Sequence, residues 1–181
     1  MKMERKWAMP NRETFSIKPI KKLIQEELID GIIIDPFAGK SKVATITNDI
    51  DPQYKTDFNL DALDFLKKQE RNSVDVLLFD PPYSVRQVSE VYRKLGRTVN
   101  METTQSTFWS KLKDEVARIV RPGGKVISFG WNSMGIGKTR GFKIKRILLV
   151  PHGGPHNDTL CVVETKLQCD LSYITNKEGT T

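Results

Sequence analysis

The sequence has few of the features that mark secreted or membrane proteins. It contains only two cysteines, Cys161 and Cys169, which suits a reducing compartment, and nothing in the sequence calls for a disulfide between them. No apolar run approaches the roughly 18 residues of a membrane helix. The basic N-terminal stretch MKMERKWAMPNRETF lacks the apolar core of a signal peptide. We therefore expect a cytoplasmic protein with no membrane partner.

Internal repeats, low-complexity tracts and Pro- or Ser-rich linkers are also lacking. A chain of 181 residues without linkers indicates one domain, with a core large enough to fold alone. We expect a basic N-terminal arm at residues 1–16, the folded domain at 17–168 and a tail at 169–181.

Charge of one sign is in excess. Lys and Arg total 29 against 22 Asp and Glu, which gives a formal net charge of +7. Such an excess favours a polyanionic partner, with nucleic acid first. A generally basic, soluble surface explains the charge equally well.

Apolar periodicity predicts strands that alternate with helices. Strands are expected at residues 32–35, 44–47, 55–58, 74–79, 125–130, 142–150 and 159–166, and helices at 16–31, 60–69, 85–96 and 103–124. This alternation is typical of a mostly parallel sheet in an α/β fold. The segment PHGGPHND, between the last two strands, predicts an antiparallel C-terminal hairpin.

Acidic residues follow three of the expected strands. Asp35 ends the first, Asp49 and Asp51 follow the second, and Asp80 follows the strand at 74–79. In open α/β sheets, ligands bind beyond the carboxyl ends of the strands. A single acid there is usually a turn former, but several would repel one another unless ligands or hydrogen bonds occupy them. We therefore expect the binding site at this edge.

The stretch DVLLFDPPYS, residues 75–84, runs from an apolar strand into Asp80, two prolines and Tyr83. An exocyclic amine on a base is a poor nucleophile because its lone pair is delocalised into the ring. The Asp80 carboxylate and the Pro81 carbonyl can accept its two N–H groups and draw the nitrogen toward tetrahedral geometry. The prolines fix the backbone and carry no competing N–H, and Tyr83 offers a stacking face for an extruded base. A Pro-rich turn with a surface tyrosine is the plainer interpretation.

DPPY at residues 80–83 resembles the catalytic motif of the amino-methyltransferases that modify adenine N6 or cytosine N4 in DNA. DPFAG at 35–39 resembles their S-adenosylmethionine loop, and the resemblance extends from about residue 14 to 166. It implies a single-domain Rossmann-like fold with a seven-stranded sheet, in agreement with the strands counted above. It also implies S-adenosylmethionine as the cofactor, and the catalytic residues Asp80, Pro81, Pro82 and Tyr83.

The same resemblance implies a cofactor site. The loop 35–39 would line the methionine half, an acid after the second strand would bind the ribose hydroxyls, and its apolar neighbour would pack on the adenine. An Asp-Ala pair further on would meet the adenine edge, and TFSIKP, residues 14–19, would close over the methionine end. The implied cofactor-binding residues are Phe15, Lys18, Asp35, Pro36, Phe37, Ala38, Gly39, Asp49, Ile50, Asp61 and Ala62.

The sequence departs from the family in its first crossover. Only residues 36–43 separate Asp35 from the next expected strand, whereas a parallel crossover normally needs about a dozen residues or more. The first helix must therefore be a single turn or absent, although its N-terminus usually helps to hold the cofactor carboxylate. Lys40, Ser41 or Lys42 is the candidate substitute, and loss of cofactor affinity in Lys40→Ala would test it.

No segment is large enough to be a separate target-recognition domain. Basic residues in the arm, after the catalytic loop and in the glycine-rich 130–141 segment would contact mainly phosphates, although a solvated surface explains them too. Residues of the 151–158 loop would meet the flipped base or its phosphates. Short recognition by these loops is compatible with a homodimer. The expected nucleic-acid-binding residues are Arg86, Lys138, Arg140, His156 and Asn157.

The segment PHGGPHNDTLC brings two histidines and a cysteine close together in sequence. The spacing of His152, His156 and Cys161 fits no usual zinc pattern, and a fourth ligand is missing. We expect no metal.

These observations predict an S-adenosylmethionine-dependent methyltransferase that acts on DNA, with adenine N6 as the first choice. Cytosine N4 or RNA remains open because DPPY does not separate these substrates. A degenerate relative that only binds nucleic acid or cofactor also remains open, supported by the short crossover and opposed by the intact motif. Glutamine-modifying protein methylases usually carry Asn where this chain has Asp80.

Overall fold

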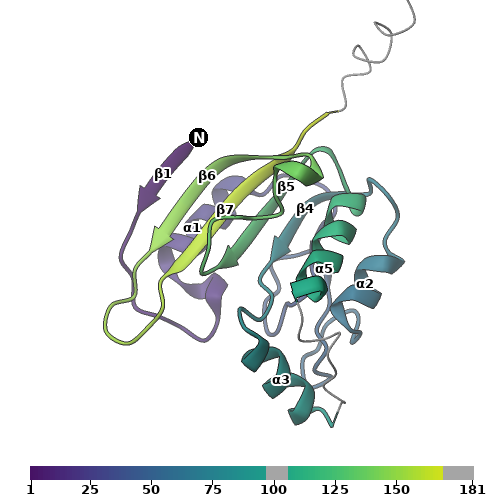
Figure 1. Ribbon diagram of the computed structural model, residues 1–181, viewed down its shortest axis with the longest axis horizontal. Helices are drawn as coiled ribbons and strands as arrows, with labels where there is room; N and C mark the ends of the chain where they lie inside the picture. The colour runs from purple at the N-terminus through teal and green to yellow at the C-terminus, as the bar shows by residue number, and fades with distance from the viewer. Residues whose placement is uncertain (97–105, 169–181) are drawn as a thin grey trace, which may run out of the picture.

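Seven strands form one sheet in the computed structural model, which describes residues 1–96 and 106–168. The strands are β1 (Lys2–Arg5), β2 (Ile33–Asp35), β3 (Ile46–Thr47), β4 (Val74–Phe79), β5 (Val120–Gly130), β6 (Phe142–Val150) and β7 (Thr159–Lys166). Their order is β1-β6-β7-β5-β4-β2-β3, and only β7 runs antiparallel to its neighbours (Figure 1). The predicted mostly parallel, seven-stranded sheet with an antiparallel C-terminal hairpin is confirmed.

Helices cover both faces of the sheet (Figure 1). They are α1 (Lys18–Glu27), α2 (Ala62–Lys68), α3 (Val85–Lys94) and α5 (Ser106–Ile119), with short 3-10 turns η1 (Thr14–Ser16) and η2 (Lys138–Arg140). The α1 helix packs on one face of the sheet, and α2 and α5 pack on the other. Alternate residues of β4 point to opposite faces, so this strand contributes to both cores. Val76 and Leu78 join the α1 core, whereas Leu77 and Phe79 join the α2–α5 core.

The helix that precedes β5 is shorter than the sequence pattern predicts. It ends at Ile119, and β5 already begins at Val120, which pairs with Val74 across an irregular register. Residues 120–124 therefore belong to the strand rather than to the expected helix, with Gly123 at a φ of 78°. Residues 103–105 of that predicted helix lie outside the described residues.

The seven strands are not the seven that the sequence predicts. Residues 55–58 form no strand and contribute only an isolated bridge between Phe58 and Asn48. Residues 2–5, inside the segment expected to be an arm, form β1 and pair in parallel with β6. The predicted count is correct because β1 adds a strand at the opposite edge of the sheet. The assignment of 55–58 as a strand is wrong, since this segment pairs only through one isolated bridge.

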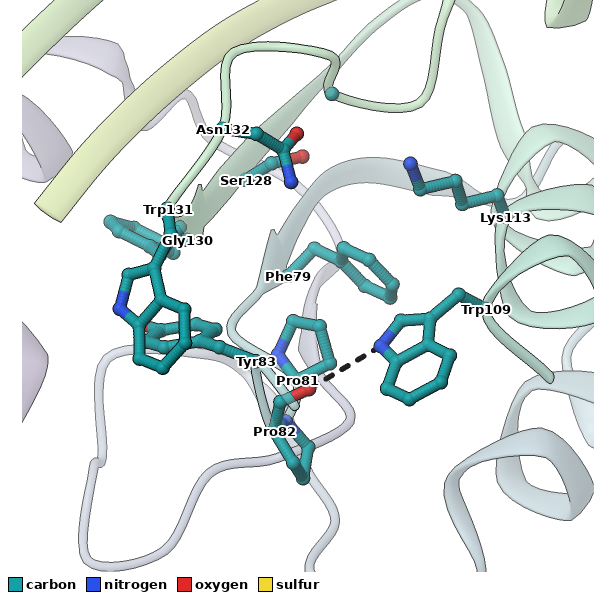
Figure 2. Close-up of a pocket in the computed structure, with 12 residues that line it drawn as sticks. Phe79, Pro81, Pro82, Tyr83, Trp109, Lys113, Ser128, Gly130, Trp131 and Asn132 are labelled. Carbon is teal, nitrogen blue, oxygen red and sulfur yellow. Dashed lines mark hydrogen bonds between the residues drawn. The ribbon is translucent and has the colours of Figure 1, made fainter. Parts of the chain in front are cut away.

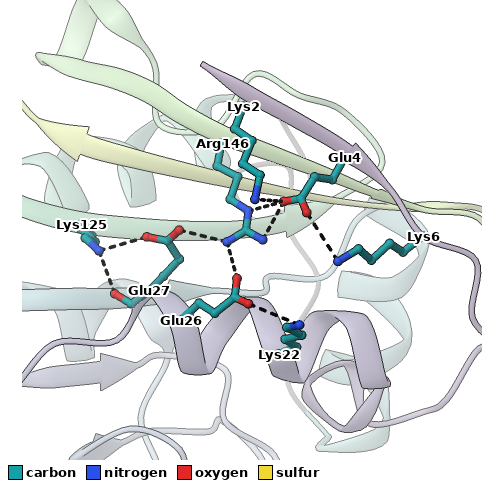
Figure 3. Close-up of polar contacts among 8 residues, drawn as sticks. All are labelled: Lys2, Glu4, Lys6, Lys22, Glu26, Glu27, Lys125 and Arg146. Carbon is teal, nitrogen blue, oxygen red and sulfur yellow. Dashed lines mark hydrogen bonds and ion pairs between the residues drawn. The ribbon is translucent and has the colours of Figure 1, made fainter.

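An ion-pair cluster holds β1 in place (Figure 3). Arg146 on β6 is only 10% exposed and contacts Glu4 of β1 at 2.6 Å and Glu26 of α1 at 2.7 Å. Burial alone would raise the pKa of Glu4, but hydrogen bonds from Arg146 and Lys2 lower it to about 2. The cluster joins segments that are 142 residues apart in the chain. It explains why a polar strand such as KMER becomes part of the sheet.

The crossover from β2 to β3 contains no helix in residues 36–45, as its length predicts. The buried side chain of Asn48 holds it instead. Its amide nitrogen donates to the carbonyls of Pro36 at 3.0 Å and Leu60 at 3.1 Å, and its oxygen accepts from the Leu60 N–H at 3.0 Å. These hydrogen bonds give partners to the backbone groups of Pro36 and Leu60, which lie in loops and belong to no helix or strand.

Candidate active site

The carboxyl ends of β2, β3 and β4 meet at one edge of the sheet. The chain connects β2 to β3 on one side and then returns to β4 on the other side of β2. The two connections therefore run in opposite directions from β2, and ligands of open α/β sheets bind at such a switch point. Asp35 ends β2, Asp49 follows β3 and Asp80 follows β4. The acids predicted for this edge are therefore close in space, and Asp80 and Asp49 both act electrostatically on Asp35.

Two adjoining cavities of about 480 and 450 Å³ lie at this edge. The residues that line both are Thr14, Phe37, Gly39, Tyr54 and Asp80. The first cavity also includes Phe15, Ala38 and Lys40, and the second includes Asp49, Ile50 and residues 81–83. Both volumes lie in the usual range for sites that bind small molecules or cofactors.

Asp35 lies fully buried beside these cavities without lining them. Its Oδ1 accepts the Phe37 N–H at 3.0 Å, whereas Oδ2 has no hydrogen-bond partner among the described residues. Burial raises the pKa of Asp35 to about 8, helped by the neighbouring Asp80 and Asp49 and opposed by the Phe37 N–H. The carboxyl is therefore largely protonated at neutral pH in the free protein.

Asp49 fixes the loop that follows β2. Its carboxylate accepts the Gly39 N–H at 2.8 Å and the Asp51 N–H at 2.9 Å. Gly39 has a φ of 53°, in the region that favours glycine, so the turn can bring its N–H to Asp49 without strain. Burial raises the pKa of Asp49, and these two N–H groups oppose the shift.

The Asp-Pro-Pro-Tyr loop is held by its neighbours. The Tyr83 hydroxyl donates to the Asp80 carboxylate, and the Tyr83 N–H donates to Gln87 at 2.6 Å. Burial raises the pKa of Asp80, whereas hydrogen bonds from Tyr83 and Thr14 oppose the rise.

The two prolyl carbonyls of this loop differ in their hydrogen bonding. The Pro82 carbonyl accepts Trp109 Nε1–H at 3.3 Å (Figure 2). The Pro81 carbonyl accepts no hydrogen bond from the part of the chain that the structure describes. Pro81 also lines the second and third cavities.

A third cavity, of about 180 Å³, lies where this loop meets α5. Figure 2 shows Trp109 on one side, Trp131 and Tyr83 on the other, and Phe79 behind them. The Tyr83 and Trp131 ring centroids are 5.4 Å apart at 58°. Lys113 and Ser128 also line this space. Residues 81–83 thus border both the second and the third cavity.

Besides Asp35, four more predicted cofactor residues do not line the two larger cavities. Lys18 is exposed at the start of α1, and Lys21 lines the first cavity instead. Pro36 is buried. Asp61 caps α2 by accepting the Leu63 N–H at 2.9 Å, and it also accepts the Tyr92 hydroxyl; Ala62 is buried behind it.

The predicted nucleic-acid-binding residues differ in their exposure and in their contacts. Lys138, His156 and Asn157 are exposed. Arg86 is exposed but pairs with Glu90 at 2.8 Å. Arg140 binds Asp114 at 2.7 Å and the Ser110 hydroxyl at 2.8 Å, which ties η2 to α5 and occupies much of its guanidinium.

His152 has a structural role. It is only 6% exposed, its Nδ1–H donates to the Ala8 carbonyl at 2.8 Å, and its Nε2 accepts the Thr159 hydroxyl at 2.9 Å. Within residues 1–96 and 106–168, no group of three or more His, Cys, Asp or Glu side chains is placed to hold a metal ion. No helix in these ranges is both long and apolar enough to cross a bilayer.

Several residues at the cavities were missed by the sequence argument. They are Thr14, Tyr54, Trp109, Lys113 and Ser128. Trp109 and Lys113 both lie on α5, and Ser128 lies on β5. Thr14 begins the segment 14–19 that was expected to close over the cofactor, although it was not among the candidate residues. Phe108 lies in the core, and the neighbouring Trp109 is half-buried against that core while it borders the third cavity.

The sheet order and the acidic edge define a Rossmann-like methyltransferase fold. The chain resembles 1,6-didemethyltoxoflavin-N1-methyltransferase from Burkholderia thailandensis, with a TM-score of 0.56, 10% identity and 83% and 78% of the two chains covered. It also resembles TrmN from Thermus thermophilus, with a TM-score of 0.54, 15% identity and 83% and 49% covered. For NSun6 from Pyrococcus horikoshii the values are 0.52, 14%, and 81% and 50%.

The chain thus spans about half the length of TrmN and NSun6. No protein-family model matches the sequence, and no curated protein matches it. The likeness therefore establishes the fold alone.

Proposed function

We propose that the protein is an S-adenosylmethionine-dependent methyltransferase that modifies an exocyclic amine in nucleic acid, with adenine N6 in DNA as the substrate. The observation that carries this proposal is the position of residues 80–83. Asp80 borders the two larger cavities, and residues 81–83 separate the second of these from the aromatic cavity. A group-transfer enzyme needs this arrangement, with donor and acceptor on opposite sides of the groups that orient them.

The residues of the larger cavities fit S-adenosylmethionine. Asp49 stands where a carboxylate is expected to bind ribose hydroxyls, and Ile50 beside it offers an apolar surface for the adenine. The Asp35 Oδ2, which has no hydrogen-bond partner in the part of the chain that the structure describes, lies close enough to respond to a cation in the site. Lys40 remains our candidate for the cofactor carboxylate; it lines the first cavity and has only a 3.8 Å ion pair with Glu13. When bound, the cofactor supplies an electrophilic methyl group.

The chain's own groups would orient the amine. The Asp80 carboxylate accepts one N–H and the Pro81 carbonyl accepts the other, so that the nitrogen lone pair turns toward the methyl group. Trp109 holds the Pro82 carbonyl and thereby fixes the loop. Tyr83 lies between the cavities, where its ring can contact an extruded base.

A nucleic-acid substrate is supported by charge. The formal net charge is +7, and Lys138 and His156 remain exposed candidates for phosphate contacts. The choice of DNA and of adenine N6 rests on the resemblance of residues 80–83 to the DNA amino-methyltransferases. RNA and cytosine N4 are the alternatives that the same site allows.

The test uses labelled S-adenosylmethionine with genomic DNA and, separately, total RNA, followed by mass spectrometry of the nucleosides. We expect label in DNA as N6-methyladenine. Asp80→Ala should lower the rate about a hundredfold or more while S-adenosylmethionine binding remains detectable by calorimetry. Asp64→Ala, which removes an exposed carboxylate on α2, should leave the rate and the cofactor affinity unchanged.

Each other outcome has a definite meaning. Label in cytosine or only in RNA would replace the proposed substrate by the corresponding alternative. Cofactor binding without transfer to any nucleic acid would identify a degenerate relative. Transfer that persists in Asp80→Ala would refute the proposed role of Asp80.

A further inference from the structure

The aromatic cavity between the Asp-Pro-Pro-Tyr loop and α5 contains polar groups that the proposed chemistry does not use. Ser128 on β5 is 8% exposed and lines the cavity, and its hydroxyl has no hydrogen-bond partner among the described residues. Lys113 extends from α5 toward the same space (Figure 2). A buried hydroxyl without a partner is unfavourable, and an acceptor on a bound ligand would relieve that cost.

The segment that closes this cavity is fixed by the fold. Glu164 on β7 accepts the Ile136 N–H at 2.6 Å and the Gly137 N–H at 3.1 Å. Gly135 packs so closely on Glu164 that a Cβ there would lie 2.2 Å from its Oε2. The segment 131–137, which carries Trp131, is therefore held over the cavity before any ligand arrives.

The walls and the polar groups together indicate the kind of ligand. Trp109, Trp131 and Phe79 form an apolar surface suited to a flat ring. Ser128 can donate one hydrogen bond, and Lys113 is a donor only. A ligand that satisfies both must carry acceptors on its ring edge, as adenine and cytosine do through ring nitrogens or a carbonyl. A side-chain amide has no ring to fill the space between the indoles.

We propose that this cavity receives the ring of the unstacked target base, with Ser128 and Lys113 donating to acceptors on its ring edge. The inference rests on the proposed function and deepens it, because it assigns two residues that position the base and select it by its acceptors. Trp109 and Trp131 form the walls of the cavity. Asp80 and Pro81 remain the groups that orient the amine.

The experiment compares Ser128→Ala and Lys113→Met with Lys111→Met, a matched control for an exposed lysine on the same helix. The substrate is a synthetic duplex that carries the site found by sequencing DNA modified by the wild type. We expect kcat/KM to fall about tenfold in each cavity variant and to stay within about twofold in the control. The calorimetric Kd for S-adenosylmethionine should be unchanged in all three.

A second measurement separates positioning from a structural defect. Duplexes in which one ring nitrogen of the target base is replaced by carbon are tested with the wild type and with Ser128→Ala. We expect one of these analogues to abolish the difference between the two proteins, because the hydroxyl then has no acceptor. An equal loss on every analogue, or rates within about twofold of the wild type for both cavity variants, would overturn the inference while leaving the methyltransferase proposal intact. If the wild type modifies no nucleic acid at all, the proposed function fails, and this inference fails with it.

Discussion

Binding of S-adenosylmethionine should release protons from the protein. The cofactor carries a sulfonium and an ammonium group, and the site holds three carboxyls, Asp35, Asp49 and Asp80, whose pKa values are all raised by burial. A cation placed near a buried carboxyl favours its ionised form. Binding should therefore lower these pKa values and drive protons into the solvent.

The size of the effect follows mainly from Asp35. With a pKa of about 8, about nine in ten of these carboxyls carry a proton at pH 7. A return toward the ordinary value of 3.8 would release about 0.9 proton per protein, to which Asp49 and Asp80 can only add. Because the ligand prefers the ionised form, its affinity should rise with pH up to about 8 and then level off.

Titration calorimetry in buffers of different ionisation enthalpy measures this release directly. The slope of the observed enthalpy against the buffer enthalpy gives the number of protons. Asp35→Asn is the matched control, since an amide oxygen can still accept the Phe37 N–H while the titrating group is gone. A binding enthalpy that does not depend on the buffer, or an unchanged release in Asp35→Asn, would refute this account of the site.

Two further predictions concern the scaffold. Arg146→Met should lower the thermal midpoint of unfolding at neutral pH. Burial alone would raise the pKa of Glu4, but Arg146 and Lys2 lower it from 4.5 to about 2. The stabilisation from the Glu4–Arg146 pair is therefore present above about pH 4.5 and is lost as the pH falls toward 2. The midpoints of variant and wild type, measured across that range, should converge as the pH falls, and a constant gap would contradict the role given to the cluster. Gly135→Ala should cost about 1–3 kcal/mol in urea unfolding because its Cβ would collide with Glu164, whereas Gly154→Ala, also at positive φ but with open space around it, should cost less. Equal losses would mean that backbone strain alone explains both.

The sheet was predictable where the signal is local. The apolar runs at 74–79, 142–150 and 159–166 correspond to β4, β6 and β7 because each buries its own side chains. The strand β1 was not predictable, because its sequence KMER is polar and its stability comes from β6 and from Arg146 far along the chain. The short crossover was predicted from its length, but the role of Asn48 in holding it depends on partners in two other loops.

In the candidate site, too, some residues were predictable from the local sequence and others depend on distant packing. Motif residues such as Gly39, Asp49 and Asp80 lie at the cavities. The sequence predicts them because each lies a short way beyond the end of a strand, and the end of that strand fixes its position. Trp109 and Ser128 reach the site through the packing of α5 and β5, which sequence spacing does not encode. Asp61 lies at an expected helix start, and capping explains it as well as ligand binding does.

The contacts around Asp80 show how the free protein keeps its proposed catalytic groups in place. A partly buried carboxyl between cavities is unfavourable, and Tyr83 and Thr14 reduce that cost by hydrogen bonding to it. Trp109 meanwhile binds the Pro82 carbonyl, whereas the Pro81 carbonyl accepts no hydrogen bond from residues 1–96 and 106–168. In the proposed mechanism, an incoming amine would share the Asp80 carboxylate with Tyr83 or displace the Tyr83 hydroxyl. The proposed stacking of Tyr83 on the base and its hydrogen bond to Asp80 are thus linked, because the same ring carries the hydroxyl that holds Asp80.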